Sequence, residues 1–259
     1  MHGTTAKLPA YRALLSVDVK NFSGEKGVDH AALTESIPKI LRKGFERCDL
    51  GELWEDQIFW DGTGDGYVMG NRSEVLPFLL NPFLPALQHE LAERNANAQR
   101  PIRMRATVNV GPMAGVGGGI SAGSGVSRVE NHRLLDDRAV RGLLERSGPS
   151  TCVGAIISER AFQDAVVAGY TGEDPDVYVK VQAAEKEYQA AAYLRVPQPS
   201  GDLVRKGFAP DEEPEHRAAG EAESPSRRAD GVTMGPQNGP GSTQFAGNNY
   251  GGIKHNFSS

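Results

Sequence analysis

The feature that most constrains the fold of this chain is an apolar run that ends in an aspartate. Residues 11–18 have the pattern of a buried β-strand, and Asp18 closes it. A carboxylate at the end of a buried strand is unfavourable unless it is paired or bound to a cation. Asp65 lies in the glycine-rich turn at residues 61–66, where a hairpin would let a second carboxylate converge on the same cation. The two aspartates together predict a divalent-metal site.

Each aspartate taken alone has a simpler interpretation. Asp18 could cap the strand end or form half of an internal ion pair. Asp65 could be a turn residue, because Asp-Gly sequences suit tight hairpins. For one residue at a time the simpler interpretation is favoured, whereas the two residues in combination favour the metal site.

Composition limits the class of protein. The chain has 259 residues, of which 39% are hydrophobic, and its apolar periodic segments stop near Val196. The net charge of −5, with no arginine stripe that carries interleaved aromatics, argues against nucleic-acid binding. No window approaches the roughly 18 apolar residues of a membrane span. Cys48 and Cys152 lack metal-ligand spacing. We therefore expect a soluble, cytoplasmic protein with reduced thiols.

Hydrophobic periodicity predicts strands that alternate with helices. Strands are expected at residues 11–18, 52–60, 66–70, 102–111, 151–157, 176–183 and 188–196. Helices are expected at residues 29–47, at 74–96 with interruptions at Pro82 and Pro85, and at 128–147. Ser158 is expected to begin another helix as its N-cap. Strands with intervening helices and a hairpin favour an α+β sandwich of the ferredoxin-like type.

Composition also divides the chain into three parts. Residues 10–197 hold the folded domain, and residues 198–230 are rich in Pro, Gly, Ala and mixed charge, which predicts a flexible linker. Residues 231–259 form a Gly/Asn-rich tail with spaced aromatics and little charge, the composition of ladders that stack between chains. A disordered C-terminal tail is the alternative interpretation.

Residues 10–196 resemble the catalytic domain of class III nucleotide cyclases in five segments that occur in the family's order. Residues 17–24 resemble the first metal motif, residues 64–66 the second, residues 105–112 the next strand with its Gly-Pro turn, residues 131–136 the catalytic helix, and residues 180–194 the closing hairpin. The resemblance implies a cyclase-like α+β fold and a nucleoside triphosphate as the substrate.

The resemblance assigns metal and phosphate ligands. It implies two divalent cations, Mn²⁺ or Mg²⁺, held by the carboxylates of Asp18 and Asp65 and by the backbone carbonyl of Val19. The triphosphate would lie against the backbone amides of the turn that follows the first strand, which comprises Asn21, Phe22, Ser23 and Gly24.

Three further residues are candidates for catalysis. Arg133 matches the family's helix arginine, which stabilises transition-state charge, and Lys186 approximates the lysine that meets the terminal phosphates. The family's transition-state asparagine lies four residues before the arginine, where this chain has Val129, whereas Asn131 lies only two residues before it. Either the helix register shifts or this role is lost.

Structural interpretations remain open for several of these residues. Arg133 could pair with Glu130 or Asp137 on the helix surface, and Lys186 could be a solvated hairpin charge. His132 is expected to be structural. The Gly/Ser-rich residues 115–125 favour a mobile flap over a phosphate loop, because no Gly-Lys-Ser/Thr follows them.

The base-reading position departs from the best-known patterns. Four residues before the second metal aspartate, adenylate cyclases have a lysine and guanylate cyclases typically a glutamate, whereas this chain has Asp61. A carboxylate cannot donate a hydrogen bond to adenine N1, which disfavours ATP and leaves guanine and the pyrimidines. Over its whole length the chain resembles bacterial pyrimidine cyclases of Pycsar-type phage defence. We therefore predict UTP as the substrate and cyclic UMP as the product.

The resemblance predicts an active cyclase in antiviral defence that works as a head-to-tail homodimer, with metal ligands from one subunit and Arg133 from the other. A guanylate or adenylate cyclase in signalling is one alternative. A catalytically degenerate cyclase-like module that binds nucleotide or serves as a scaffold is another. The tail resembles short bacterial amyloid signalling motifs, which implies self-assembly or coupling to a receptor.

Overall fold

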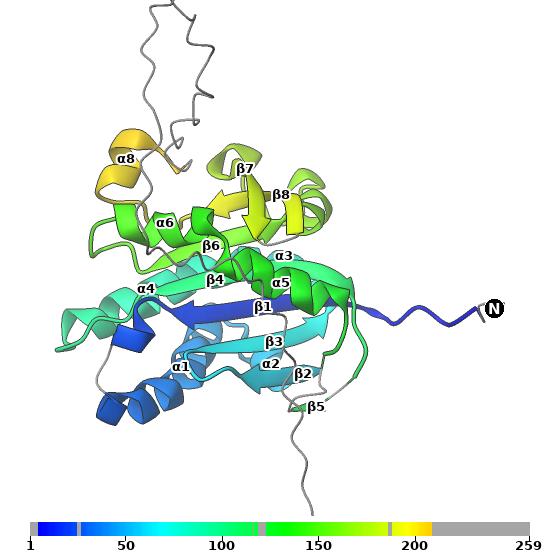
Figure 1. Ribbon diagram of the computed structural model, residues 1–259, viewed down its shortest axis with the longest axis horizontal. Coiled ribbons are helices and arrows are strands. Elements are labelled where there is room, and N and C mark those ends of the chain that lie inside the picture. The colour runs from blue at the N-terminus through cyan, green and yellow to red at the C-terminus, as the bar shows by residue number, and fades with distance from the viewer. Residues whose placement is uncertain (1–4, 25–26, 116, 119–122, 186–187, 209–259) are drawn as a thin grey trace, which may run out of the picture. The chain divides into compact units, whose positions relative to one another are not determined.

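The computed structural model describes residues 5–24, 27–115, 117–118, 123–185 and 188–208, which form one sheet with helices on both faces (Figure 1). The described sheet has eight strands in the order β5-β2-β3-β1-β4-β6-β8-β7. The strands are β1 (Tyr11–Val19), β2 (Phe59–Gly62), β3 (Gly66–Arg72), β4 (Met104–Pro112), β5 (Gly117–Gly118), β6 (Val153–Ser158), β7 (Val179–Glu185) and β8 (Tyr188–Arg195).

Helices and short helical turns connect the strands. The α-helices are α1 (Gly27–Arg47), α2 (Gly51–Glu55), α3 (Leu76–Leu80), α4 (Phe83–Ala96), α5 (Val126–Asp136), α6 (Arg138–Arg146), α7 (Glu159–Ala161) and α8 (Asp202–Lys206). The 3-10 turns are η1 (Phe22–Gly24), η2 (Ser73–Val75) and η4 (Pro175–Val177), and η3 (Phe162–Val167) is a π-helical segment.

The central strands confirm the predicted ferredoxin-like arrangement. β1 lies between β3 and β4 and is antiparallel to both, and β2 pairs with β3 as a hairpin. This order, with a helical connection from β1 to β2 and another from β3 to β4, is that of the split βαβ sandwich. β6 extends the sheet parallel to β4, and the β7–β8 hairpin follows at that edge. The fold is therefore an α+β sandwich with an added strand and hairpin.

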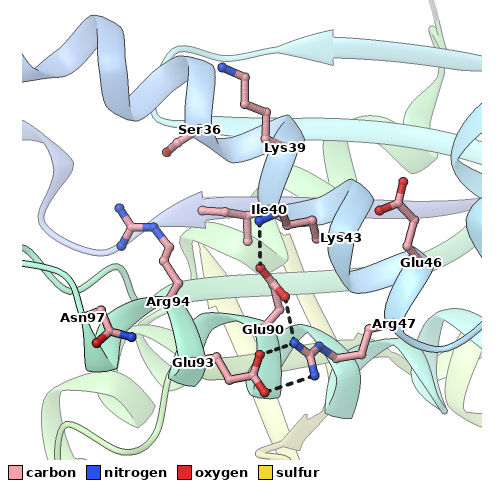
Figure 2. A pocket seen from close by; sticks show the side chains of 10 residues that line it. All are labelled: Ser36, Lys39, Ile40, Lys43, Glu46, Arg47, Glu90, Glu93, Arg94 and Asn97. Carbon is pink, nitrogen blue, oxygen red and sulfur yellow. Dashed lines mark hydrogen bonds and ion pairs between the residues drawn. The ribbon is translucent and has the colours of Figure 1, made fainter.

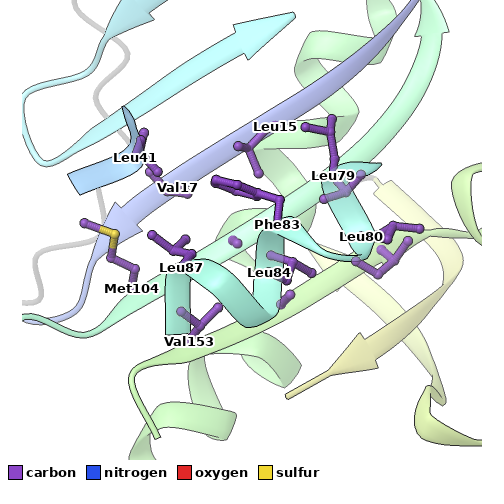
Figure 3. Packing of buried hydrophobic residues seen from close by; sticks show 14 of the residues in the cluster. Leu15, Val17, Leu41, Leu79, Leu80, Phe83, Leu84, Leu87, Met104 and Val153 are labelled. Carbon is purple, nitrogen blue, oxygen red and sulfur yellow. The ribbon is translucent and has the colours of Figure 1, made fainter. Parts of the chain in front are cut away.

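Alternate residues of the strands supply two apolar faces. On one face, Leu15 and Val17 of β1 pack against α1, α3 and α4 (Figure 3). The Phe83 ring of α4 stacks on Phe45 of α1 with 4.0 Å between ring centroids, and both side chains are fully buried. On the opposite face, α5, α6 and α8 bury a second cluster that contains Leu143 and Ile156. The period of two along each strand explains why neighbouring residues such as Ile156 and Ile157 belong to different clusters.

Two predicted elements differ from the structure, and a third agrees with it in part. The predicted strand at residues 52–60 is the short helix α2 followed by β2. The interruption predicted at Pro82 in the helical stretch 74–96 is present, because proline has no N–H to continue a helical ladder, whereas Pro85 lies in the first turn of α4 and does not interrupt it. The predicted helix at 128–147 is divided at Asp137, whose extended backbone ends α5 and whose carboxylate caps α6. The predicted N-cap at Ser158 is confirmed, since its hydroxyl accepts a hydrogen bond from the amide of Ala161.

The packed domain continues past the boundary that composition suggested. Composition predicts a flexible linker from residue 198, but residues 198–208 include α8, whose Leu203 is only 2% exposed and packs in the same cluster as α6. The hydroxyl of Thr151 also donates to the carbonyl of Gln198 at 2.7 Å. Residues 209–259, which hold the rest of the predicted linker and the tail, lie outside the described residues. None of the helices described here combines the length and apolar character that crossing a membrane requires.

Asp137 links two layers of the fold and offers a test of it. Its carboxylate is buried and accepts hydrogen bonds from the amides of Ala139 in α6 and Ala184 in β7, each at 2.8 Å. Asp137→Ala leaves both amides unpaired, so we expect a loss of about 2–4 kcal/mol in the free energy of unfolding by urea. Asp174→Ala is the matched control, because Asp174 is an exposed cap that accepts one bond from Asp176. Equal losses in the two variants would contradict the linking role.

Candidate active site

The two aspartates singled out in the sequence line the same cavity. Asp18 is the penultimate residue of β1, and Asp65 lies in the turn between β2 and β3. Together with Asp136 of α5 they border a cavity of about 160 Å³, whose other walls include Thr63 and His132. We call this cavity the acidic pocket. The predicted convergence of Asp18 and Asp65 on one site is therefore present.

Backbone contacts hold the hairpin turn against β1. The amide of Val19 donates to the carbonyl of Asp65 at 2.9 Å. Gly66 lies so close to β1 that a Cβ atom there would stand 2.3 Å from the carbonyl oxygen of Val17. Only glycine permits this approach, so the Asp-Gly sequence does more than favour a tight turn. It allows the second carboxylate to reach the first.

Asp18 forms an internal ion pair with Arg105 of β4. The two residues are directly opposite in the β1–β4 register, and the guanidinium contacts both carboxylate oxygens. Nε of Arg105 donates to Oδ1 at 2.7 Å, and the side chains of Arg105 and Asp18 are 15% and 11% exposed. The ion pair named as an alternative for Asp18 is thus present in the same pocket as Asp65. Arg105 belongs to a segment of the family resemblance, but nothing in the sequence alone placed it opposite Asp18.

Burial shifts the pKa of Asp18 upward. Loss of solvent around the carboxylate raises its pKa to about 6, an effect larger than the opposing attraction of Arg105. The negative charges of Asp65 and Asp136 add to the rise. A second positive charge in the pocket would favour the ionised form of Asp18, as expected of a cation site.

His132 has a place in the pocket that the sequence did not suggest. It lies one helical turn before Asp136 on α5, and both side chains line the cavity. Burial lowers the pKa of His132, and the charge of Arg128 lowers it further, while Asp136 and Asp61 raise it. The four-residue spacing of His132 and Asp136 shows that the two side chains share one face of a helix. The sequence does not show which part of the fold that face contacts, so it could not place His132 in the pocket.

Asn131 and Arg133 do not line the acidic pocket of their own chain. The side chain of Asn131 is fully buried, and its Nδ2 donates to the Ser16 hydroxyl at 2.6 Å. Its Oδ1 has no hydrogen-bond partner in the part of the chain that the structure describes. Arg133 lies on the flank of α5 near Tyr188, where its charge acts to lower the pKa of that phenol. Within the described residues Arg133 forms no ion pair with Glu130 or Asp137.

The remaining predicted ligands are placed in part. The predicted phosphate turn follows β1 directly as η1, with Asn21 at a φ of 62° and the Gly24 amide bonded to the Asn21 carbonyl. The ring of Phe22 packs on His30 with centroids 4.6 Å apart. Roles for Phe22, Ser23 and the Val19 carbonyl stay predictions. Lys186 lies outside the described residues.

Asp61 forms a second arginine–carboxylate pair. Nη2 of Arg128 on α5 donates to Oδ2 of Asp61 on β2 at 2.8 Å. The side chains are 16% and 26% exposed, so the pair is shielded and still reachable from solvent. Position 61, predicted to read the base, therefore carries a fixed carboxylate and an adjacent cationic donor.

The donor set of the acidic pocket fits a hard divalent cation. Carboxylates are preferred ligands of Mg²⁺, which in nucleotide enzymes is bound by one or two of them together with substrate phosphates and water. Asp18 and Asp65 meet that requirement. Among the described residues no group of three or more His, Cys, Asp and Glu forms a closed metal cage. The pocket therefore suits a cation that binds together with the phosphates of a substrate. It suits less well a cation that protein ligands alone would hold.

A larger cavity, of about 810 Å³, lies between α1 and α4 (Figure 2). Its charged side chains pair with one another: Arg47 contacts Glu90 and Glu93, and Lys43 lies 3.8 Å from Glu90. These exposed pairs satisfy each other's charge and bring no cluster of reactive groups together. We therefore take the smaller acidic pocket as the candidate site.

Comparison with known proteins identifies the fold. No protein-family model matches the sequence, and comparison with curated proteins found no match. Among solved structures, a bacterial light-regulated adenylyl cyclase is similar with a TM-score of 0.52 and 11% identity over 79% of this chain and 59% of that chain. The guanylyl cyclase Cya2 (TM-score 0.47, 14% identity) covers 77% of this chain and 97% of its own. The fold is that of a class III nucleotide cyclase catalytic domain.

The raised pKa of Asp18 predicts how stability changes with pH. In the unfolded chain an aspartate has a pKa near 3.8, so between about pH 4 and pH 6 the folded state binds more protons, and the free energy of unfolding falls as pH rises. Asp18→Asn removes this dependence. From pH 4.5 to pH 7.5 we expect wild type to lose on the order of 2 kcal/mol relative to the variant in urea titrations. Parallel pH profiles would contradict the assignment.

Proposed function

We propose that the protein is a metal-dependent nucleotide cyclase, which converts a nucleoside triphosphate into a 3',5'-cyclic nucleotide and pyrophosphate. The observation that carries this proposal is the acidic pocket, in which Asp18 of β1 and Asp65 of the β2–β3 turn meet. The cyclase-type fold supports it. Fold alone would not suffice, because one fold serves many functions, so the argument rests on the carboxylate pair.

Different residues of the chain would have different roles in cyclisation. Asp18, Asp65 and the Val19 carbonyl would hold the divalent cations, which, when bound, neutralise phosphate charge and promote loss of the 3'-hydroxyl proton. Arg105, beside Asp18, supplies positive charge for phosphate oxygens, and the η1 turn supplies backbone amides. The 3'-oxygen then forms a bond to the α-phosphorus, the bond to the β-phosphate breaks, and the hydroxyl proton leaves to water.

A head-to-tail dimer would complete the site. Arg133 lies toward Tyr188 and away from the acidic pocket of its own chain, so we propose that it serves the pocket of a second copy. Asn131 is fully buried against Ser16 and cannot touch a substrate in this arrangement. We therefore keep Arg133 and not Asn131 in the proposed mechanism. Asn131 instead holds α5 on the sheet.

UTP, with cyclic UMP as the product, is the first candidate because of the overall resemblance to pyrimidine cyclases, whereas the carboxylate of Asp61 only disfavours ATP. GTP is the next candidate, because that carboxylate leaves guanine possible. The proposed link to antiviral defence rests on the resemblance of the sequence to bacterial pyrimidine cyclases. Assembly through residues 231–259 is likewise a proposal from sequence, since that segment lies outside the described residues.

A nucleotide-binding module without turnover is the second candidate. Two observations favour it: Arg105 holds both carboxylate oxygens of Asp18, and Asn131 is turned into the core. Analysis of products from all four ribonucleoside triphosphates separates the two candidates. Pyrophosphate and a cyclic nucleotide identify a cyclase, whereas saturable binding without product identifies the module.

Removing one pocket carboxylate tests the metal-dependent chemistry. We expect Asp65→Ala to lower Mg²⁺- or Mn²⁺-dependent pyrophosphate release at least ~100-fold, because charge neutralisation at the phosphates contributes several kcal/mol. EDTA should abolish the wild-type rate, and added Mg²⁺ should restore it. Asp56→Ala, an exposed aspartate that follows α2, is the control and should retain the wild-type rate. Unchanged turnover in Asp65→Ala would sink the proposed mechanism.

Mixing two inactive variants tests the shared site. In a head-to-tail heterodimer of Asp65→Ala and Arg133→Ala, one site carries both substitutions and the other carries neither. After subunit exchange at equal concentrations we expect about a quarter of wild-type activity to return. A mixture of Asp65→Ala and Asp18→Ala is the control, because both residues belong to the same half-site and nothing should return. If the first mixture is as inactive as the control, Arg133 does not act across subunits.

A further inference from the structure

We propose that a cavity at the start of β1 binds a small organic cation, an ammonium group that carries an aromatic or branched aliphatic body. The cavity has a volume of about 430 Å³, and small-molecule sites commonly measure about 300–1,000 Å³. Two of its lining residues are Tyr11 and Tyr170, so we call it the tyrosine cavity. Binding there is independent of the proposed cyclase reaction.

The tyrosine cavity and the acidic pocket lie at opposite ends of β1. Tyr11, the first residue of β1, lines the tyrosine cavity, whereas Asp18, near the other end, lines the acidic pocket. The length of strand between the two residues corresponds to about 23 Å. Their side chains also project to opposite faces of the sheet, because successive residues of a strand alternate. A ligand in the tyrosine cavity is therefore separate from a substrate in the acidic pocket.

The most buried lining residues are apolar and form the floor of the tyrosine cavity. Leu76 of α3 is 3% exposed and Val110 of β4 is 5% exposed. Val110 is opposite Ala13 in the β1–β4 register, so its side chain shares the face of the sheet that carries Tyr11. Pro77 of α3 adds a further apolar contact. This floor would bury the hydrocarbon part of a ligand, and it offers no side-chain oxygen to a hard metal ion.

Tyr170 presents an exposed ring on a fixed backbone. The residue follows η3 and is 74% exposed. Its amide donates to the carbonyl of Ala165 at 2.9 Å, and the carbonyl of the next residue, Thr171, accepts a hydrogen bond from Nδ2 of Asn81 at 2.9 Å. The backbone is thus held on both sides of the ring. A large apolar side chain that is held in place yet left in solvent is typical of a binding surface.

The second ring, that of Tyr11, already attracts one cation. The guanidinium carbon of Arg160 lies 5.7 Å from the ring centroid, and Nη1 donates to the phenol oxygen at 3.0 Å. Tyrosine rings attract cations because the ring face carries negative potential. Arg160 does not line the tyrosine cavity. It therefore restrains the Tyr11 ring and leaves the side that lines the cavity to a ligand.

Charge complementarity selects a cation for the tyrosine cavity. The lining carries two carboxylates, Glu74 of η2 and Asp164 of η3, and no Lys, Arg or His. Asp164 forms no ion pair within the described part of the chain. Glu74 has only a loose contact with Arg72 at 3.7 Å, and both side chains are exposed. An ammonium group would gain the attraction of the two carboxylates, whereas an anion would be repelled.

Three probes that share a phenyl ring and differ in charge test the site: 2-phenylethylammonium, 2-phenylethanol and phenylacetate. Their dissociation constants are measured with full-length protein from the methyl NMR shifts of Leu76 and Val110, which report on the floor of the cavity itself. The variants are Asp164→Asn, which removes one charge, and Tyr170→Leu, which removes a ring and keeps apolar bulk.

We expect the ammonium probe to bind at least about fivefold more tightly than the alcohol, and phenylacetate to bind most weakly. Asp164→Asn and Tyr170→Leu should each lower the ratio of the ammonium affinity to the alcohol affinity at least about twofold. The matched controls are Asp56→Asn, an exposed aspartate after α2, and Phe78→Leu, an exposed aromatic of α3 that does not line the cavity. Both controls should leave the ratio unchanged.

Every other result overturns the proposed site. Equal binding of the ammonium and the alcohol would show an apolar cavity without preference for a cation. The same conclusion follows from a ratio that either variant leaves at its wild-type value, or from methyl shifts that no probe moves. Ammonium binding that Asp65→Ala abolishes would place the cation in the acidic pocket. Because no readout uses turnover, a protein without cyclase activity that shows the expected preferences retains the tyrosine cavity, so the two proposals fail separately.

Discussion

The closure of the β2–β3 turn onto β1 is the constraint on which the site depends. The bond from the Val19 amide to the Asp65 carbonyl, and the close approach of Gly66 to the Val17 carbonyl, bring two carboxylates from separate strands to one cavity. A Cβ at position 66 would push the turn away and separate the carboxylates. Backbone contacts between the turn and β1 thus create the acidic pocket.

Bringing carboxylates together in a shielded place is unfavourable, and the structure offsets only part of this cost. Arg105 supplies a counter-charge to Asp18 from the neighbouring strand, and the pKa of Asp18, at about 6, shows that this counter-charge does not fully offset burial. The pocket therefore retains an affinity for further positive charge. A divalent cation that enters with a triphosphate would meet that demand, and the phosphates would in turn meet Arg105.

The sequence predicted the parts of this site that depend on local pattern. Asp18 at the end of an apolar strand and Asp65 in an Asp-Gly turn are readable from neighbours along the chain, and so is the ferredoxin-like order of strands and helices. Arg105 opposite Asp18 depends on strand register, and Arg128 beside Asp61 depends on how a helix lies over a hairpin. Both are tertiary relations, which periodicity along one element does not contain. The division of the predicted helix at Asp137 is similar, because a carboxylate caps a helix only when its amides are in reach.

Helix α5 shows why these tertiary relations matter together. Arg128, His132 and Asp136, four residues apart, face the hairpin and the acidic pocket. Asn131 faces the sheet and holds the helix to β1, and Arg133 lies on the opposite flank toward β8. One helix thus anchors itself by one face, borders the pocket with a second and presents a cation with a third. A small rotation of α5 would move all three groups at once, so the bond of Asn131 to Ser16, which restrains that rotation, helps to fix how Arg128, His132 and Asp136 are placed relative to the pocket.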